Sequence, residues 1–467
     1  MSIKTDLHTA AAAVTAAEST VESTTAAASP SGWPKRYTLL GLCFLAAFIC
    51  YIDRVNISVA AIAMQEHFGW SETVKGLVLS SFFIGYMLFQ VPSGYLANRF
   101  GGKWLLGIAV AWWSLFTMIT PFAALSLPLL IAARIGMGLG EAAMFPGAYS
   151  LFGRWVPPNE RSRAVALLLS GVPVGNVFAL LTSGWIVAHF GWPSVFYIFG
   201  ASGVIWVLVW WRCAYNDPAE HPSISSEERA LLATHTQVAT HTQVAAHAQD
   251  AMSNDKAWHK DDSVTVPWKK LLSTPAVWAL ITNHFCSNWG LYMMLAWLPS
   301  YFRKALGFSI EYAGLYAAAP WLIMFLTINL SGWIADVMTR SGIGLTFIRK
   351  SMQTFGLLGS SACLLLAGSS ASAMQSVLLM CGALGALGFT WSGFLPNHLD
   401  IAPRFAGVLM GITNTAGTIP GIIGVAITGW LVDVSGSYNS AFALTAAVNL
   451  FGLVVWLLFG TGKRVID

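Results

Sequence analysis

The sequence predicts an all-α membrane protein with twelve transmembrane helices in two pseudo-symmetric bundles of six. Three observations support this prediction. The 467 residues are 56% hydrophobic and only 10% charged, whereas about a quarter of the residues in soluble domains are charged. Twelve segments contain the roughly 20 mostly apolar residues that a spanning helix needs. Short motifs also recur between the two halves of the chain, as they do in many transporters.

The apolar segments fall into two sets of six, separated by a polar stretch. The first six expected helices cover residues 37–64, 73–97, 103–123, 127–153, 161–188 and 193–213. The second six cover residues 274–302, 310–337, 348–370, 372–397, 404–431 and 438–461. These limits predict a tail at 1–32, a bundle at 33–213, a linker at 214–273, a second bundle at 274–461 and a tail at 462–467. The first tail is rich in Ala, Ser and Thr without an apolar core, so we expect it to be disordered and cytoplasmic.

The two halves repeat each other weakly. GYLANRFGGKW at 94–104, after the second segment, corresponds to GWIADVMTRSG at 332–342, after the eighth. SGWIV at 183–187 likewise matches TGWLV at 428–432. Such repeats indicate two related bundles around a central cavity.

The basic residues are sorted by side of the membrane. Of the 25 Lys and Arg residues, only Lys75, Arg303 and Lys304 fall on the outer side, and Arg54 and Arg134 fall inside spans. The others lie on the side of the termini, which the positive-inside rule assigns to the cytoplasm. We therefore expect a multi-pass protein of the cell inner or plasma membrane with both termini cytoplasmic. This pattern also explains the net charge of +4 without nucleic-acid binding.

Neither the cysteines nor the linker histidines indicate a metal site. The six cysteines lie in or at the ends of expected spans, where they are typical small apolar residues. His235, His241 and His247 recur every six residues, which separates successive rings by about 240° on a helix. We therefore expect no metal, no disulfide and no cofactor.

Four charged residues lie deep inside the expected spans. Asp53 and Arg54 interrupt the first helix, and Arg134 and Glu141 lie on the fourth. Seven positions apart, the latter two differ by only about 20° around the helix axis. Each charge at the bilayer centre costs about 2.5–3.5 kcal/mol or more, so this quartet requires a structural or functional reason.

Two interpretations of the quartet are open. The charges sum to zero, so two salt bridges between the first and fourth helices are one interpretation. The other is a coupled site, because an arginine in a low-dielectric cavity binds a carboxylate through two hydrogen bonds. Burial favours the neutral form of a nearby acid, and protonation of that acid removes a counter-charge from the arginine. Proton binding and anion binding are then linked.

Five motifs resemble those of one transporter family. They are YIDRVNISVA at 51–60, SSFFIGYMLFQVPSGYLA at 80–97, RIGMGLGEAAMFPG at 134–147, RWVPPNERSRA at 154–164 and NHLDIAPRFAGVLMGITNTAGTIPG at 397–421. Together they are similar to the anion:cation symporter family of the major facilitator superfamily. That family includes bacterial sugar-acid permeases, plant plastid anion transporters, and the sialin, vesicular glutamate and type I phosphate carriers. The resemblance runs from about residue 36 to 461, except for the linker, and implies the major facilitator fold.

The resemblance implies roles for the buried charges. By resemblance, Asp53 and Glu141 carry protons, and Arg54 contacts the substrate carboxylate. Arg134 contributes to the substrate site by organising the acidic pair or gating the site. Tyr51, one turn from Arg54, supplies a hydroxyl to the anion.

Uncharged residues complete the expected site. Gln90, in the second motif, is assigned to it, and because all four charges belong to the first half, the second half must contribute neutral groups. Asn414 is the preferred candidate, since it lies in GITNTAG, where small residues let the backbone approach a cavity. Ser392 and Thr415 are assigned with it. Further candidates are Asn283, His284, Asn288, Thr390 and Thr418, each of which can instead bond a neighbouring helix.

The loop GYLANRFGGK resembles the superfamily's gating loop between the second and third helices. Asn98 stands where that loop usually has an Asp, beside Arg99. Asp336 keeps the acid at the equivalent place in the second half. We expect these three residues to act in gating.

The expected function is proton-coupled symport of an organic anion by alternating access. The vesicular glutamate carriers have charged or titratable residues where this chain reads Ser287 and Leu79, so a monocarboxylate such as a sugar acid is favoured over a dicarboxylate. The alternative is an anion exchanger or a potential-driven anion or phosphate uniporter. No catalytic motif is present, so the chain is not expected to be an enzyme. The expected partners are the anion, H⁺ and the lipid bilayer, with the protein a monomer.

Overall fold

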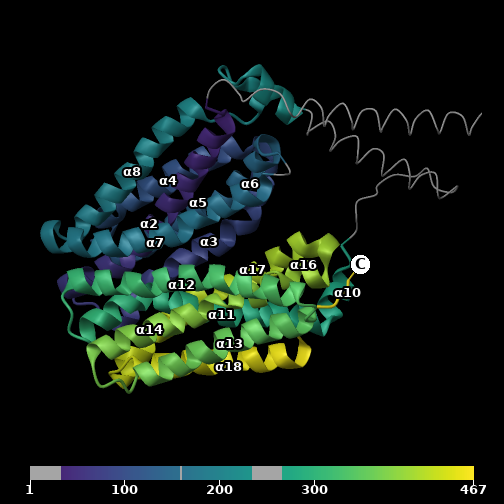
Figure 1. Cartoon of the computed structure of the whole chain (residues 1–467). Coiled ribbons are helices and arrows are strands. Elements are labelled where there is room, and N and C mark those ends of the chain that lie inside the picture. Colours follow the sequence, from purple (N-terminus) through teal and green to yellow (C-terminus); the bar gives the residue numbers. More distant parts are fainter. Residues whose placement is uncertain (1–32, 158–159, 234–265, 467) are drawn as a thin grey trace, which may run out of the picture.

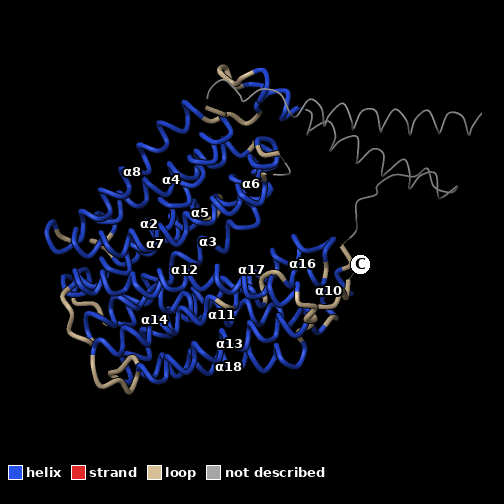
Figure 2. The backbone as a smooth tube through the Cα atoms, viewed as in Figure 1, coloured by secondary structure: helices blue, strands red, loops and turns tan. Residues whose placement is uncertain are grey.

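The described part of the chain is almost entirely helical. The computed structural model describes residues 33–157, 160–233 and 266–466. Every regular element in these ranges is a helix (Figure 2). The expected disordered tail and the linker histidines lie outside the described residues.

The helices form two bundles, one from each half of the chain (Figure 1). The first contains α2 (Lys35–Phe68), α3 (Glu72–Phe100), α4 (Gly102–Ala123), α5 (Leu127–Glu141), α6 (Met144–Trp155), α7 (Arg161–Phe190) and α8 (Trp192–Cys213). In the chain, the short helices η1 (Pro218–Glu220) and α10 (Trp268–Ser273) come after the first bundle and before the second. The second bundle contains α11 (Pro275–Lys304), α12 (Ile310–Arg340), α13 (Leu345–Ala367), α14 (Ala373–Gly388), α15 (Thr390–Gly393), α16 (Asn397–Ile401), η2 (Pro403–Phe405), α17 (Ala406–Ser435) and α18 (Asn439–Phe459).

These elements make the twelve spans that the sequence predicts. Helices α5 and α6 form one span, and α14, α15 and α16 form another. In the described ranges, ten helical segments are long and apolar enough to cross a membrane. The other two spans are α11 and α13, with 30 and 23 residues. They are more polar because side chains such as Asn283 and Gln353 face each other inside the second bundle, where Gln353 Nε2 donates to Asn283 Oδ1 at 2.9 Å.

Short turns join the helices at the end of the molecule away from the linker, which we call the far side. Gly69 and Gly436 end α2 and α17 in the left-handed conformation, with φ of 66° and 67°. Ser71, Ser309 and Ser372 then cap α3, α12 and α14 through their hydroxyls. These caps satisfy backbone groups that would otherwise lack partners at the helix ends.

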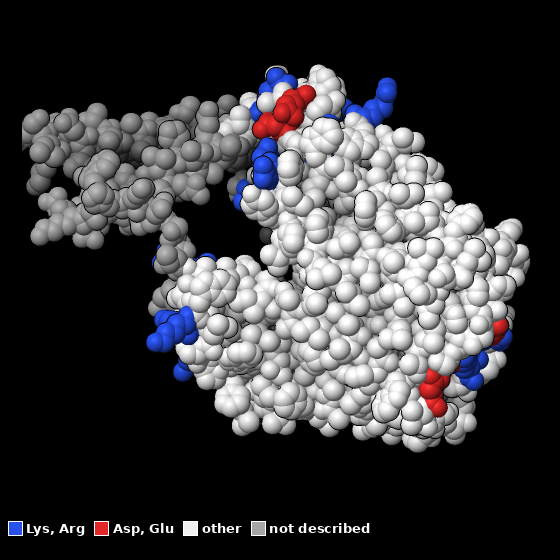
Figure 3. Space-filling view, turned by 180° about the vertical axis from the view of Figure 1, so that it is seen from behind, with Lys and Arg blue, Asp and Glu red and all other residues white. Residues whose placement is uncertain are grey.

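The opposite end, which we call the linker side, is where α2 begins, α18 ends and the linker leaves the first bundle (Figure 1). The two bundles diverge there, and the molecule is hollowed between them (Figure 3). They meet through α3 with α17, α7 with α12 and α2 with α11. The structure is therefore open toward the linker side and closed on the far side.

The described start of the linker is attached to the first bundle. Glu228 accepts hydrogen bonds from the backbone N–H of Arg36 at 3.0 Å and from its Nη1 at 3.1 Å. Arg36 Nε also bonds Glu160 at 3.0 Å. This part of the expected linker is therefore fixed to the bundle that precedes it.

Candidate functional site

A pocket lies between the two bundles near the middle of α2. Four helices line it, three from the first bundle and α11 from the second. The lining residues are Arg54, Ile57, Ser58, Leu79, Phe82, Phe83, Arg134, Tyr292, Leu295 and Ala296. Two arginines thus face an otherwise largely apolar and aromatic space, in which a charge is poorly screened.

Arg54 is bound by Glu141. Its Nε and Nη2 donate to the same carboxylate oxygen, Oε2, at 3.0 and 2.9 Å. The thiol of Cys50 donates to that oxygen as well, at 3.3 Å. The other oxygen, Oε1, is buried and has no hydrogen-bond partner among the described residues. One carboxylate oxygen therefore occupies the guanidinium edge that could bind an anion.

A break in the fourth span positions Glu141. Helix α5 ends at this residue and α6 starts at Met144. Pro146 has no N–H, so the carbonyl of Ala142 cannot receive its usual helical bond. Ser93 Oγ on α3 bonds that carbonyl instead, at 3.2 Å. The sequence prediction of one continuous helix over 127–153 misses this break.

Aromatic rings surround the Arg54 guanidinium. Its central carbon lies 4.5 Å from the Tyr51 ring centroid, and 4.9 Å from those of Phe82 and Tyr86. Phe82 is shared, because the Arg134 guanidinium lies 5.4 Å from the same ring. Such contacts stabilise a cation by about 0.5–2 kcal/mol without neutralising it. The rings therefore hold both arginines in place and leave their charge available.

Asp53 and Arg134 form no direct pair. Both Asp53 carboxyl oxygens and Arg134 Nε are buried without hydrogen-bond partners among the described residues. In the part of the chain that the structure describes, Arg134 Nη1 has one hydrogen-bond contact, with Met137 Sδ at 3.0 Å. The structure therefore contains one ion pair in the quartet, between Arg54 and Glu141, instead of the two that the purely structural interpretation requires.

This arrangement can bind an anion when one of its acids becomes protonated. A neutral Glu141 would release Arg54, and a neutral Asp53 would leave the two arginines with excess positive charge. A substrate carboxylate could then accept two parallel hydrogen bonds from the guanidinium.

The assigned residues of the second half lie outside the lining of this pocket. Ser392 Oγ is bonded to Ser331 Oγ at 2.8 Å, and Thr415 Oγ1 donates to its own helix at Gly411. Asn414 is half-buried on α17. Their roles in binding stay predictions.

The further candidates of the second half bond neighbouring backbone. Asn283 and Asn288 donate to the carbonyls of Gly452 and Gly417 on adjacent helices. Thr390 donates to the carbonyl of Leu387 at the end of the preceding helix α14, and Thr418 donates within α17. His284 is buried, and its Nδ1 has no hydrogen-bond partner among the described residues.

The remaining assigned residues lie toward the linker side. Gln90 is half-buried on α3, with its Oε1 buried and unpartnered in the described structure. Asn98 and Arg99 are exposed near the end of α3, and Asp336 is exposed near the end of α12. The bundles are apart at this end, so a gating role for these three residues also stays a prediction.

Sequence reasoning missed the residues of the second half that do reach the pocket. Tyr292 lines it from α11, with its ring centroid 4.5 Å from that of Phe83 on α3. Tyr292 lies four positions after Asn288, so the helical period places both near one face. That spacing is the signal that could have identified it.

Glycines allow α3 and α5 to approach closely beside the pocket. A Cβ added to Gly138 would lie 2.1 Å from the carbonyl oxygen of Phe82. A Cβ added to Gly85 would lie 1.9 Å from that of Ile135. The backbone contact therefore fixes the position of the ring that both arginines share.

Gly138→Ala is expected to destabilise the protein by about 1–3 kcal/mol, the usual cost of overpacking. The cause is the clash with the backbone of Phe82. This loss is measured by heating purified protein in detergent and using size-exclusion chromatography to determine how much folded protein remains at each temperature. Gly153→Ala is the control, because its added Cβ meets nothing within 4 Å. Equal melting temperatures for the two variants would contradict the expectation.

Comparison with known proteins identifies the relatives of the chain. The family profile described as Major Facilitator Superfamily matches residues 43–425. "Probable anion transporter 4, chloroplastic" from Oryza sativa subsp. japonica is 41% identical over 93% of this chain and 70% of its own length. From Arabidopsis thaliana, "Sodium-dependent phosphate transport protein 1, chloroplastic" is 41% identical over 93% and 81%, and "Ascorbate transporter, chloroplastic" is 40% identical over 93% and 76%.

Solved structures share the fold. A bacterial homologue of the human lysosomal transporter Spinster, inward-facing and occupied, has a TM-score of 0.71 at 18% identity, covering 92% of this chain and 97% of its own. The inward open xylose transporter XylE from E. coli has a TM-score of 0.70 at 14% identity, covering 92% and 98%.

The relatives correct one expectation from the sequence. The cell inner or plasma membrane, with cytoplasmic termini, is wrong as a location, because four relatives at 40–41% identity are named chloroplastic and point to a plastid membrane. The sorting of basic residues defines two sides of a membrane but does not identify the membrane.

Proposed function

The chain belongs to the Major Facilitator Superfamily and is an anion transporter, and from this premise we propose that it carries an organic monocarboxylate together with protons. Transport proceeds by alternating access between the two bundles. The observation that carries the proposal is that Arg54 binds one oxygen of Glu141 beside Asp53, whose oxygens have no hydrogen-bond partner among the described residues.

Glu141 competes with the substrate for Arg54. Arg54 Nε and Nη2 both donate to one oxygen of Glu141. Glu141 therefore occupies the edge of the guanidinium that a substrate carboxylate needs. Protonation of Glu141 weakens this contact, since a neutral acid attracts the guanidinium less strongly. The substrate then replaces Glu141 as the counter-charge of Arg54.

Asp53 provides the second proton site. Its carboxyl group is completely buried and accepts no hydrogen bond in the described structure. An ionised carboxylate in such a place costs several kcal/mol, so we propose that Asp53 also binds a proton during the transport cycle. Arg134 has no acid within ion-pair distance in the described structure, so a protonated Asp53 would leave the pocket positive and attractive to an anion.

The charge of the site supports linked binding. With both acids ionised the quartet is neutral, and each proton adds one positive charge. A monovalent anion restores neutrality when one proton has bound. Because a net charge in a low-dielectric site is expensive, the proton and the anion each favour binding of the other.

Aromatic rings support a sugar acid as the substrate class. Tyr51, Phe82 and Tyr86 surround Arg54, and Tyr292 faces them from the second half. Such rings pack against the C–H faces of a polyol while tyrosine hydroxyls bond its hydroxyl groups. The name of one relative refers to ascorbate, a sugar-derived monovalent anion, which agrees with this class. We place the protein in a plastid membrane, as the names of its relatives suggest.

The alternative is phosphate or another anion moved by exchange, by the membrane potential or with sodium. The name of a relative that is 41% identical refers to sodium-dependent phosphate transport, which favours keeping this candidate. Phosphate is small and has no C–H face, so it would make little contact with the aromatic rings that line the pocket. The two proposals therefore differ in both substrate and driving ion.

Uptake into proteoliposomes tests the proposed function. Ascorbate, gluconate and phosphate are each supplied under an inward proton gradient, an inward sodium gradient or neither, with the membrane potential clamped. We expect a proton gradient to accumulate a sugar-derived acid several-fold above its external concentration. Accumulation of phosphate under sodium alone, or equal uptake without any gradient, would favour the alternative.

A further inference from the structure

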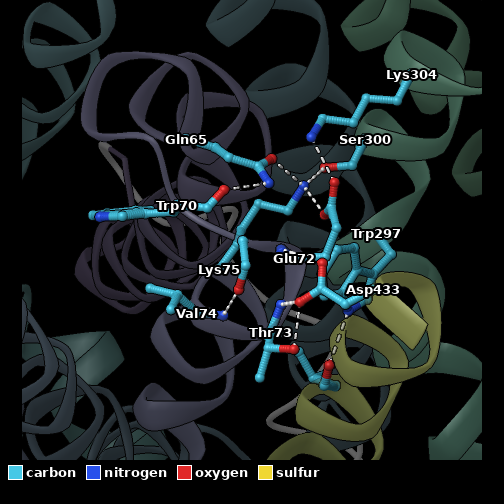
Figure 4. A network of polar contacts seen from close by, with 12 residues as sticks. Gln65, Trp70, Glu72, Thr73, Val74, Lys75, Trp297, Ser300, Lys304 and Asp433 are labelled. Atoms are coloured by element: carbon cyan, nitrogen blue, oxygen red, sulfur yellow. Dashed lines mark hydrogen bonds and ion pairs between the residues drawn. The ribbon is translucent and has the colours of Figure 1, made fainter. Parts of the chain in front are cut away.

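A second group of charged residues closes the far side, away from the substrate pocket. It lies where α2 and α3 of the first bundle meet α11 and α17 of the second (Figure 4). We call the set Gln65, Glu72, Thr73, Lys75, Ser300, Lys304 and Asp433 the far-side cluster. None of its members lines the pocket.

Lys75 is the buried centre of this cluster. Its side chain is completely buried. The ammonium group donates hydrogen bonds to Gln65 Oε1 at 2.8 Å and Ser300 Oγ at 3.1 Å. It also forms an ion pair with Glu72 Oε2 at 2.6 Å. The Trp297 ring lies 4.7 Å from the same nitrogen. Ser300 and Trp297 belong to the opposite bundle, so the environment of Lys75 is complete only when the far side is closed.

Asp433 caps a helix of the opposite bundle. Its Oδ1 accepts from the backbone N–H of Glu72 at 2.9 Å, and its Oδ2 accepts from that of Thr73 at 2.7 Å and from the Thr73 hydroxyl. The cap of α3 itself, Ser71, serves a different N–H group, that of Val74. The N-terminus of α3 therefore depends on a carboxylate from α17 to satisfy its remaining free N–H groups.

An ion pair also joins the two bundles where α3 meets α11 and α17, a contact that we call the first seam. Lys304 at the end of α11 contacts Oε1 of Glu72 on α3. The side chain of Glu72 is only 10% exposed, so this contact is less screened than a surface pair. Glu72 thus contacts Lys304 of the other bundle through Oε1 and forms an ion pair with Lys75 on its own helix through Oε2.

The charges are arranged so that the seam can open. The first bundle contributes one acid and one base, Glu72 and Lys75, and the second contributes Asp433 and Lys304. Within the far-side cluster, the charges of each bundle therefore sum to zero. When the bundles separate, Glu72 and Lys75 can stay paired within α3, because they lie three residues apart on one helix. The contacts of Asp433 and Lys304 must break.

Close backbone packing makes the closed seam sensitive to separation. A Cβ added to Gly429, one turn before Asp433, would lie 2.4 Å from the carbonyl oxygen of Glu72. The other seam between the bundles is equally close, since a Cβ added to Gly314 on α12 would lie 2.6 Å from the carbonyl oxygen of Leu180 on α7. The two seams open together if the bundles move as units.

We propose that Asp433 and Lys304 hold the far side shut and thereby set the balance between the two open states of the carrier. They are positioning residues, because they act through α3 and contact no part of the pocket. The helix that they fix also carries Phe82 and Phe83 to the pocket. The inference needs alternating access but neither the proposed substrate nor proton coupling.

Hydrogen–deuterium exchange of the substrate-free protein in detergent or nanodiscs tests this proposal. Asp433→Asn and Lys304→Met each remove a contact across the first seam. The amides of residues 180–187 on α7 lie at the other seam, where Leu180 and Gly184 face Gly314, and α7 is distant in the sequence from both substitutions. We expect their exchange to rise about tenfold in each variant, as the loss of one charge-assisted hydrogen bond would produce.

The chain offers a matched control for this experiment. Arg303 on α11 and Glu66 on α2 also pair across the far side, at 3.6 Å. Arg303 is about as exposed as Lys304, at 37% against 35%, but its partner Glu66 is 58% exposed, whereas Glu72 is 10% exposed. Arg303→Gln is therefore expected to leave exchange at 180–187 unchanged. Exchange in α18, whose main contacts are with α11, α13 and α17 of the second bundle, reports general destabilisation.

The exchange results distinguish opening of the far side from general destabilisation. Faster exchange at 180–187 in Asp433→Asn and Lys304→Met, with α18 unchanged, supports the proposal. Unchanged exchange at 180–187, an equal rise in Arg303→Gln, or a parallel rise throughout α18 would overturn it. Because no substrate is present, failure here would leave the proposed function unaffected.

Discussion

Replacing Arg54 by lysine is expected to lower the rate of anion uptake by roughly 10- to 100-fold, the value of losing a charge-assisted hydrogen bond. Lysine keeps the positive charge but has no planar fork for a carboxylate. It also fits poorly among Tyr51, Phe82 and Tyr86, which now lie 4.5–4.9 Å from the guanidinium carbon. Initial uptake rates in proteoliposomes, at matched protein density, measure the effect.

Arg154→Lys is the control for this substitution. Arg154 is exposed in the last turn of α6 on the linker side, and it contributes nothing to the pocket. Its replacement should leave the uptake rate within experimental error of the unmodified protein. Near-normal transport by Arg54→Lys would show that charge alone suffices, and the proposed two-bond contact with the substrate carboxylate would be wrong.

Glu141→Gln is expected to abolish accumulation driven by a proton gradient while exchange of labelled for unlabelled substrate continues. Glutamine resembles the protonated acid, so Arg54 is released permanently and the anion can bind without a proton. The protein can then exchange substrate across the membrane but gains no energy from the gradient. Accumulation and counterflow, measured on the same proteoliposomes, separate these two activities.

Glu160→Gln provides the comparison for Glu141. Glu160 also binds an arginine, Arg36, at 3.0 Å, but it lies on the linker side, away from the pocket. Its substitution is expected to preserve both accumulation and counterflow. Intact proton-driven accumulation in Glu141→Gln would remove this residue from the coupling mechanism.

The architecture was predictable because a membrane imposes strong limits on the sequence. An apolar run of about 20 residues has few alternatives to a spanning helix. The predicted segment 73–97 is therefore close to α3 at Glu72–Phe100, and 310–337 is close to α12 at Ile310–Arg340. The twelve-span fold is confirmed by the family match and by the shared fold of solved structures.

Which charges would pair was not predictable from the sequence. Asp53 and Arg54 are neighbours in the chain, but adjacent residues on a helix point about 100° apart. Arg54 thus faces Glu141 and the pocket, while Asp53 is buried without a hydrogen-bond partner in the described structure. The partner of each charge depends on the rotation of α2 against α5, which the local sequence does not determine.

The contacts across the far side are also long-range. Asp433 caps α3 from a position 361 residues away from Glu72. Lys75 appeared in the sequence only as one of three basic residues on the outer side. Its burial among residues of both bundles depends on how the bundles meet, so hydropathy and motif spacing cannot reveal it.

The pH dependence of substrate affinity tests the central claim most directly. If protonation of Glu141 or Asp53 makes room for the anion, the Kd of the substrate should fall as the pH falls, by up to about tenfold per pH unit for one linked proton. A sugar acid stays ionised between pH 8 and 5.5, so the change reports the protein. We expect this dependence in the unmodified protein and a weaker one in Glu141→Gln. The same Kd at pH 8 and pH 5.5 in the unmodified protein would contradict the account.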